Sequence, residues 1–300
     1  ELVAHYTTTD LTPDEVHDLG LREVERIAPL LTASREAANA SPRTFYESPE
    51  ELAAAYRERL AVASERLDAL FGIAPTTPIE FLPSPYGTFY EPGAPDGSRA
   101  GVFRFAWSGR PQPLSEATFA HEAIPGHHYQ IMLQRESPQP AFRKQHLYNA
   151  FVEGWGLYAE SLGAELGLYG DPWQAYTRYH SEMWRALRLV WDTGIHARGW
   201  SLERCAEFSA PHGFSMDSIR WELERYVAWP GQALSYKVGE LEILAAVTNP
   251  GQPLAPAPRP ALLRADAHAG AATSATRAPL QRGPVLHRPE HLHADLTNLA

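Results

Sequence analysis

The sequence has 300 residues, of which 44% are hydrophobic and 21% are charged, as is typical of a globular protein of one or two domains. The formal net charge of −10 argues against a nucleic-acid partner, because phosphate binding requires clustered Lys and Arg. No apolar run reaches the roughly 20 residues of a membrane span. The single cysteine, Cys205, excludes an internal disulfide and leaves histidines and carboxylates as the ligands for any metal.

Residues 1–72 are predicted to form a helical scaffold. A Thr-Pro-Asp-Glu sequence at residues 12–15 and a Ser-Pro-Glu-Glu sequence at residues 48–51 each combine a capping hydroxyl with a proline suited to the first helical position and a glutamate three residues after the cap. Apolar residues follow each start at helical spacing, and Gly72 is a typical stop for the second helix. We interpret both helices as structural.

Residues 73–112 are rich in Pro, Gly and Ser and contain short β-prone segments at 79–82, 88–90 and 102–107. We expect these segments to form a small antiparallel sheet. Such a sheet can hold an extended peptide through main-chain hydrogen bonds. A purely structural hairpin is the alternative.

Residues 113–248 are predicted to form a helical catalytic core. Ser115 can cap its first helix, a second is expected from about residue 142 to 166, and Asp171-Pro172 opens a long third helix. Residues 249–300 are predicted to be a disordered or aberrant tail, because this Pro-, Ala-, Arg- and His-rich segment has no aromatic residue and no helical periodicity.

Three histidines and one glutamate lie close together between His121 and His128. In a common zinc-binding helix two histidines are four residues apart, and the glutamate after the first one activates water. Here the next histidines follow at six and seven residues, so an unbroken helix would direct their side chains away from His121. Pro125-Gly126 is expected to kink the helix and bring His127 back to the side of His121. We predict His121 and His127 as ligands, and His128 as a supporting or substrate-binding residue.

A third ligand is predicted on the following helix at Glu153. Gly154 and Gly156 each lower helix propensity by about 1 kcal/mol relative to Ala, which indicates close backbone packing beside Glu153. Glu160 lies seven residues further on, on the same helical face, so either a second carboxylate near the metal or a solvated stripe is consistent with the spacing. The same spacing places His146 on this face, where we expect it to belong to a solvated stripe.

A resemblance to a known family rests on four motifs that occur in the following order: HExxPGHHxQ at 121–130, FVEGW at 151–155, DTGIH with GWS between 192 and 201, and WPGQALSYKVG at 229–239. Over roughly residues 5–245 the sequence resembles the bacterial domain-of-unknown-function 885 family. That family is grouped with the zincin-like metallopeptidases of the gluzincin type. The resemblance implies a mainly α fold of the thimet oligopeptidase or carboxypeptidase Taq type, one Zn²⁺ at His121, His127 and Glu153, and Glu122 as the general base.

The sequence departs from this family at both ends. Family members are usually longer, and we expect that an N-terminal helical region is missing here. The tail does not resemble the helical C-terminus of the family and has the composition of a shifted reading frame in GC-rich DNA. We expect a cytoplasmic protein, with an exported full-length parent as the alternative.

Four further residues are candidates for a substrate cleft. Tyr236 is predicted to donate a hydrogen bond to an oxyanion, or to be a structural tyrosine. His196 is a second oxyanion candidate, or a core histidine. Arg185 and Arg188 can bind a substrate carboxylate, or pair with a structural Asp or Glu.

The predicted function is zinc-dependent hydrolysis of a peptide or small amide, of carboxypeptidase or dipeptidase type. Glu122 would act as the base, and Tyr236 or His196 would stabilise the oxyanion. Two alternatives are a non-catalytic helical protein that binds peptides and a protein with a purely structural metal site. In the structural site, His128 or Glu160 would fill the fourth position. The sequence does not predict an oligomeric state.

Overall fold

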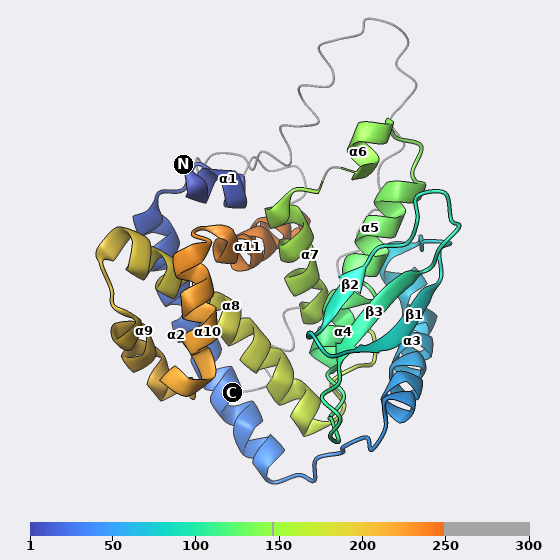
Figure 1. Cartoon of the computed structure of the whole chain (residues 1–300), viewed down its shortest axis with the longest axis horizontal. Helices are drawn as coiled ribbons and strands as arrows, with labels where there is room; N and C mark the ends of the chain where they lie inside the picture. Colours follow the sequence, from blue (N-terminus) through green and yellow to red (C-terminus); the bar gives the residue numbers. More distant parts are fainter. Residues whose placement is uncertain (146, 249–300) are drawn as a thin grey trace, which may run out of the picture. The chain divides into compact units, whose positions relative to one another are not determined.

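The computed structural model describes residues 1–145 and 147–248, so His146 and the predicted tail lie outside the described residues. This part of the chain is mainly helical with one small sheet (Figure 1). The elements are α1 (Leu2–Thr7), α2 (Pro13–Asn39), α3 (Pro49–Phe71), β1 (Ile79–Ser84), β2 (Phe89–Glu91), β3 (Gly101–Ala106), α4 (Glu116–Glu122), α5 (His127–Glu136), α6 (Ala141–Gln145), α7 (Asn149–Ser161), α8 (Pro172–Arg198), α9 (Leu202–Ser209), η1 (Ala210–His212), α10 (Met216–Ala228), η2 (Gln232–Leu234) and α11 (Ser235–Thr248).

The described chain forms two compact units. The first comprises residues 1–32, 148–154 and 179–248, and the second comprises residues 33–145, 147 and 155–178. The divisions fall inside α2, α7 and α8, each of which is a continuous helix. The four consecutive regions expected from the sequence remain a prediction.

Both predicted helix starts in the N-terminal region are confirmed. At the start of α2, the Glu15 amide donates to Thr12 Oγ1 at 3.2 Å, and the Thr12 amide donates to Glu15 Oε2 at 2.8 Å. At the start of α3, Ser48 Oγ accepts from the Glu51 amide at 3.2 Å, and the helix ends at Gly72, which has a φ of 64°. The capping residues therefore fix these boundaries as the sequence indicates.

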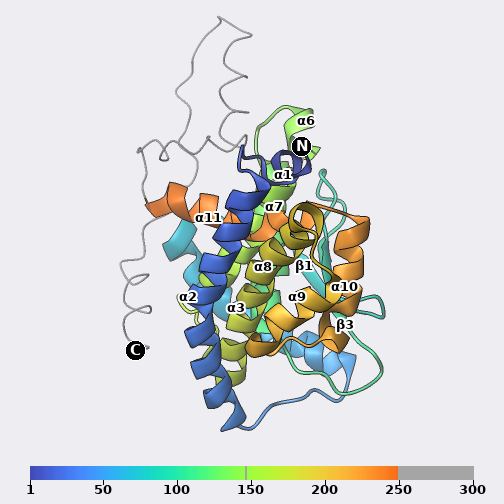
Figure 2. The same ribbon diagram turned by 90° about the vertical axis from the view of Figure 1, so that its left-hand side faces the viewer.

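In the first unit, α2 lies alongside α8 (Figure 2). A β-carbon added at Gly20 of α2 would lie 2.7 Å from Leu189 Cβ of α8, so glycine permits this close approach. Apolar side chains from α2, α8, η2 and α11 form one buried cluster, comprising Val16, Leu189, Leu234 and Val238. This packing orders the C-terminal half of α8 and the start of α11.

The second unit contains a mixed three-stranded sheet in the order β1-β3-β2. The expectation of an antiparallel sheet is therefore wrong for one strand pair: β2 is antiparallel to β3, but β1 is parallel to β3. The alternation of side chains has the same two-residue period in both arrangements, so the sequence pattern did not distinguish them. Tyr56 of α3 packs on the sheet, with its ring centroid 4.9 Å from that of Phe103.

One helix of the predicted core forms two shorter helices instead. The segment predicted as one helix from about residue 142 to 166 forms α6 and α7, which ends at Ser161. The chain then turns through Gly163 and Gly167, and Gly167 has a φ of 80° that favours glycine. Because α7 carries the FVEGW motif, its position matters most for the candidate site.

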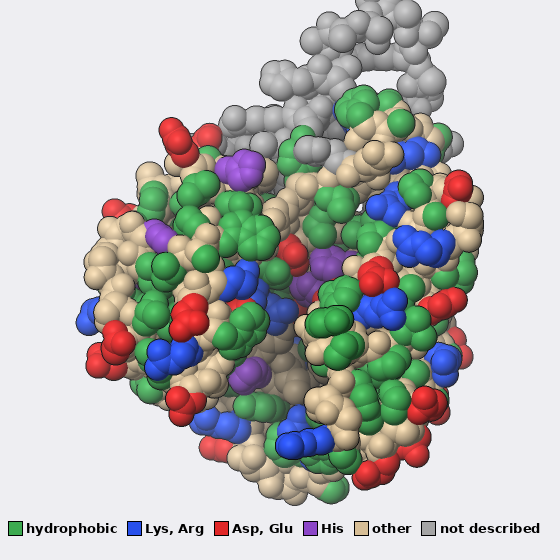
Figure 3. All heavy atoms as spheres, viewed as in Figure 1, with side chains coloured by type: hydrophobic (Ala, Val, Ile, Leu, Met, Phe, Trp, Pro, Cys, Tyr) green, Lys and Arg blue, Asp and Glu red, His purple; other side chains and the backbone are tan. Residues whose placement is uncertain are grey.

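No helix in residues 1–145 and 147–248 combines the length and the apolar character needed to cross a membrane. Acidic and basic side chains are interspersed over the face shown in Figure 3, so neither sign of charge dominates it.

Candidate metal centre

The segment from His121 to His128 is broken between two helices. α4 ends at Glu122 and α5 begins at His127. A β-carbon at Gly126 would lie 1.9 Å from the His121 carbonyl oxygen, so only glycine allows the chain to turn back this closely. The turn brings the His127 imidazole to 4.6 Å from the His121 imidazole, measured between ring centroids. The break at Pro125-Gly126 thus overcomes the six-residue spacing, as predicted.

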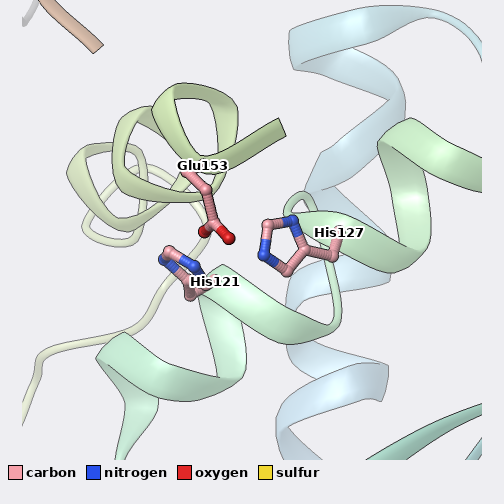
Figure 4. Close-up of side chains that lie close together, drawn as sticks. All are labelled: His121, His127 and Glu153. Carbon is pink, nitrogen blue, oxygen red and sulfur yellow. The ribbon is translucent and has the colours of Figure 1, made fainter. Parts of the chain in front are cut away.

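Glu153 on α7 completes a cluster with these two histidines. The helix continues without a break from Glu153 to Gly156, where an added β-carbon would lie 2.6 Å from His121 Cε1. One ligand atom from each of His121, His127 and Glu153 lies within 4.8 Å of the others. Figure 4 shows the Glu153 carboxylate directed toward the two imidazole rings. The three side chains predicted as metal ligands are therefore close together.

Glu160 contacts the other side of His121. Its Oε1 lies 2.8 Å from His121 Nδ1, and both side chains are buried. An ionised carboxylate only accepts, so Nδ1 carries the proton in that state and Nε2 has the lone pair for a metal. The sequence left the role of Glu160 open. Its position two turns after Glu153, on the same helical face, was the signal that it could lie near the site.

Glu122 lies beside His127. Its Oε2 is 4.0 Å from His127 Nε2, and its side chain is largely buried. The carboxylate predicted as the general base is therefore next to one predicted ligand.

His128 is directed elsewhere, although it follows His127 directly. Its Nε2 lies 3.1 Å from the Thr77 carbonyl oxygen, which can only accept, so Nε2 is the donor. Its Nδ1 lies 2.8 Å from the Tyr90 hydroxyl. Burial lowers the pKa of His128 to about 4, so the ring is neutral near pH 7 and its Nδ1 accepts from Tyr90. His128 thus connects α5 to β2, and His127 is the histidine that joins the cluster.

Trp155 was not predicted as a site residue. Its indole nitrogen donates to the Pro125 carbonyl oxygen at 2.6 Å, which holds the break between α4 and α5. The signal was available in the FVEGW motif, because an indole N–H that is removed from water requires an acceptor.

The glycines of two motifs meet in the first unit. A β-carbon at Gly154 would lie 2.4 Å from the Gly239 carbonyl carbon, so α7 and α11 touch through their backbones. Tyr236 lies one turn before Gly239. Burial raises the pKa of Tyr236, and the negative charge of Glu153 raises it further. Tyr236 therefore lies within electrostatic range of one predicted ligand.

Arg185 and Arg188 lie near Tyr236, and His196 contacts a main-chain carbonyl. The guanidinium carbons of Arg185 and Arg188 are 5.9 and 4.5 Å from the Tyr236 ring centroid. Arg188 also pairs with Glu222, the structural alternative considered for it. His196 Nε2 donates to the Tyr226 carbonyl oxygen at 2.9 Å, but His196 is exposed, so it is not a core histidine.

Comparisons with known proteins agree with the motifs. The sequence model of a family described as bacterial protein of unknown function, DUF885, matches residues 1–249. A search of curated protein sequences finds no match.

The solved structures that are similar to this chain include two bacterial proteins. A protein from Colwellia psychrerythraea described as a "putative lipoprotein" has 33% identity and a TM-score of 0.73, and the match covers 81% of this chain and 47% of that one. A "putative lipoprotein of unknown function" from Shewanella oneidensis has 16% identity and a TM-score of 0.62, covering 84% of this chain and 54% of that one, and it indicates a shared fold alone. The chain spans about half the length of these two proteins.

Proposed function

The chain belongs to the DUF885 family of bacterial proteins, and from its candidate site we propose that it is a zinc-dependent peptidase of the zincin-like, gluzincin type. The cluster of His121, His127 and Glu153 carries the proposal. Two imidazoles and one carboxylate are the protein ligands of many catalytic zinc sites, which keep a fourth position for water. We further propose that the fold is related to the thimet oligopeptidase and carboxypeptidase Taq type.

The spacing of the donor atoms supports a single ion. Two ligands at about 2.1 Å from one zinc ion are at most about 4.2 Å apart. The donor atoms lie within 4.8 Å of one another, so a small side-chain movement would suffice. A closed, structural site would need His128 or Glu160 as a fourth ligand. His128 instead contacts Tyr90 and Thr77, and Glu160 contacts His121 Nδ1, so these contacts support an open site.

Bound zinc would polarise the scissile carbonyl and lower the pKa of water. The chain's own residues would then move and stabilise charge. Glu122 would take a proton from the attacking water on its carboxylate and deliver it to the leaving amine. Glu160 would keep His121 Nδ1 protonated and the ring oriented. Tyr236 would donate a hydrogen bond from its hydroxyl to the developing oxyanion. We assign no oxyanion role to His196, because its Nε2 donates to the main chain.

The substrate that we propose is a peptide or a small amide, and carboxypeptidase or dipeptidase action is the form that Arg185 would favour. Its guanidinium lies near the ring of Tyr236, where it would reach a substrate carboxylate beside the reacting amide.

Metal analysis and peptide hydrolysis together test the proposal. We expect the full chain, after incubation with zinc and dialysis, to retain one zinc ion, and His127→Ala to lose it. The Glu122→Gln variant should retain zinc but hydrolyse peptides about 10²- to 10⁴-fold more slowly, because it lacks the general base. The exposed His5 provides the control, and His5→Ala should behave as wild type.

Two results would reject the proposal. Equal turnover in wild type and Glu122→Gln would exclude the mechanism. Peptide binding without stoichiometric zinc and without turnover would instead support the non-catalytic binding protein.

A further inference from the structure

Two side chains of α10 hold the guanidinium of Arg188, which lies on α8. Its Nε donates to the Tyr226 hydroxyl at 2.9 Å, and its Nη2 donates to Glu222 Oε2 at 3.1 Å. Tyr226 also donates to Glu222. Arg188 is only 11% exposed and Glu222 only 2%. The Arg188 side chain is therefore fixed by a buried carboxylate and a buried phenol.

This arrangement places a cation against Tyr236. The Arg188 guanidinium carbon is 4.5 Å from the Tyr236 ring centroid, within the range of a cation–π interaction. Arg225 also pairs with Glu222, at 3.0 Å. Two guanidinium groups thus share one carboxylate, and the group formed by Arg188, Arg225 and Glu222 carries a net charge of +1.

A positive charge at this position favours the function proposed for Tyr236. Burial and the charge of Glu153 both raise the pKa of Tyr236, whereas Arg188 opposes them. A phenol beside a buried cation polarises its O–H bond more strongly and is a better donor to an oxyanion.

We propose that Arg188 is a positioning residue for Tyr236, held by Glu222 and Tyr226 so that its charge orients the ring and strengthens the phenol as a hydrogen-bond donor. This assignment replaces the substrate-carboxylate role considered for Arg188 from the sequence. It rests on the proposed function, in which Tyr236 stabilises the oxyanion.

Matched peptides distinguish positioning from substrate binding. We would compare the free-acid and C-terminally amidated forms of one peptide with the wild type, Arg188→Met and Tyr226→Phe. Arg198→Met is the control, since Arg198 lies on the same helix and pairs with Asp14 near the surface. Arg188→Met should lower kcat about 10-fold for both peptides with KM unchanged, and Tyr226→Phe should lower it less. Neither substitution should lower kcat further in a Tyr236→Phe background.

A raised KM confined to the free-acid peptide would overturn the inference, because it would identify Arg188 as a substrate contact. So would a loss of equal size in the Tyr236→Phe background. Arg188→Met removes one of the two guanidinium groups that pair with Glu222, and the variant could fail to fold for that reason. Tyr226→Phe preserves the ion pair between Arg188 and Glu222 and tests the same inference in that case.

A spectroscopic measurement decides the positioning without turnover. With ¹³C-labelled tyrosine, the ring resonance of Tyr236 can be assigned from Tyr236→Phe. It should move in Arg188→Met and Tyr226→Phe and stay in place in Arg198→Met. An unmoved resonance in both test variants would overturn the inference. A wild type that hydrolyses no peptide would reject the proposed function, while the resonance would still show whether Arg188 positions Tyr236.

Discussion

At the scale of single residues, substitution of Glu160 tests the metal site without removing any of the proposed ligands. Its carboxylate is buried 2.8 Å from His121 Nδ1. Glu160→Gln preserves the size of the side chain but removes the charge that stabilises the imidazole as a ligand. We expect a 10- to 100-fold lower zinc affinity, which is typical for the loss of such a partner, measured by competition with a chromophoric chelator.

The exposed Glu80 on β1 provides the matched control, and Glu80→Gln should bind zinc as the wild type does. An unchanged affinity in Glu160→Gln would show that this carboxylate does not support the site.

Gly126 is the residue that makes the turn between the two histidines possible. Gly126→Ala would place a β-carbon 1.9 Å from the His121 carbonyl oxygen, so the backbone would have to move. We expect it to lower the free energy of unfolding by about 1–3 kcal/mol, the usual effect of overpacking, in urea titrations. The control is Gly170→Ala, because an added β-carbon at Gly170 would meet no atom within 4 Å. Equal stability of the two variants would contradict this interpretation of Gly126.

At the scale of elements, local signals predicted the boundaries that local chemistry determines. Thr12 and Ser48 mark helix starts because a hydroxyl and a glutamate within one turn satisfy the free amides. The same signals did not reveal that β1 runs parallel to β3, since strand direction depends on the path of the chain between distant segments.

The parts of the candidate site that depend on a single helix or on a single helix break were predictable from the sequence. Pro125-Gly126 identified the interruption, and the expected kink favoured His127 over His128 without fixing the choice. That choice depends on Tyr90 and Thr77, which form hydrogen bonds with His128 and are distant from it in the sequence. Trp155 was missed for the same reason, because its acceptor on Pro125 lies 30 residues away.

Asp192 on α8 makes the stability of the first unit depend on pH. Its Oδ2 accepts from the Gly231 amide at 2.8 Å, and burial raises the pKa of Asp192 to about 6 from an ordinary value of 3.8. Between pH 4 and 6 the folded chain therefore holds more protons at this carboxyl than the unfolded chain does. Through this group the stability falls as the pH rises across that range.

The Asp192→Asn variant should lose this dependence. We expect its free energy of unfolding, relative to wild type, to increase as the pH rises from about 4 to about 6, whatever the difference at pH 4. Urea titrations at several pH values would measure the slope, and a variant with the pH dependence of the wild type would contradict the raised pKa. Asp14→Asn is the control, because Asp14 is exposed and pairs only at the surface with Arg198.

At the scale of the whole molecule, the proposed ligands link segments that are distant in sequence. α4, α5 and α7 each supply one ligand, and Glu153 follows His121 by 32 residues. The unfolded chain cannot hold these side chains together, so zinc binding should be coupled to folding. A ligand that binds only the folded chain stabilises it by an amount that grows with the logarithm of its concentration.

We therefore expect zinc at about 100 times its dissociation constant to raise the free energy of unfolding by about 2.7 kcal/mol. His127→Ala should abolish this increase, because the chain loses one of three ligands, whereas His5→Ala should preserve it. Urea titrations with and without zinc measure both values. An equal increase in His127→Ala would mean that zinc stabilises the chain at another place, and that the cluster of His121, His127 and Glu153 is not its binding site.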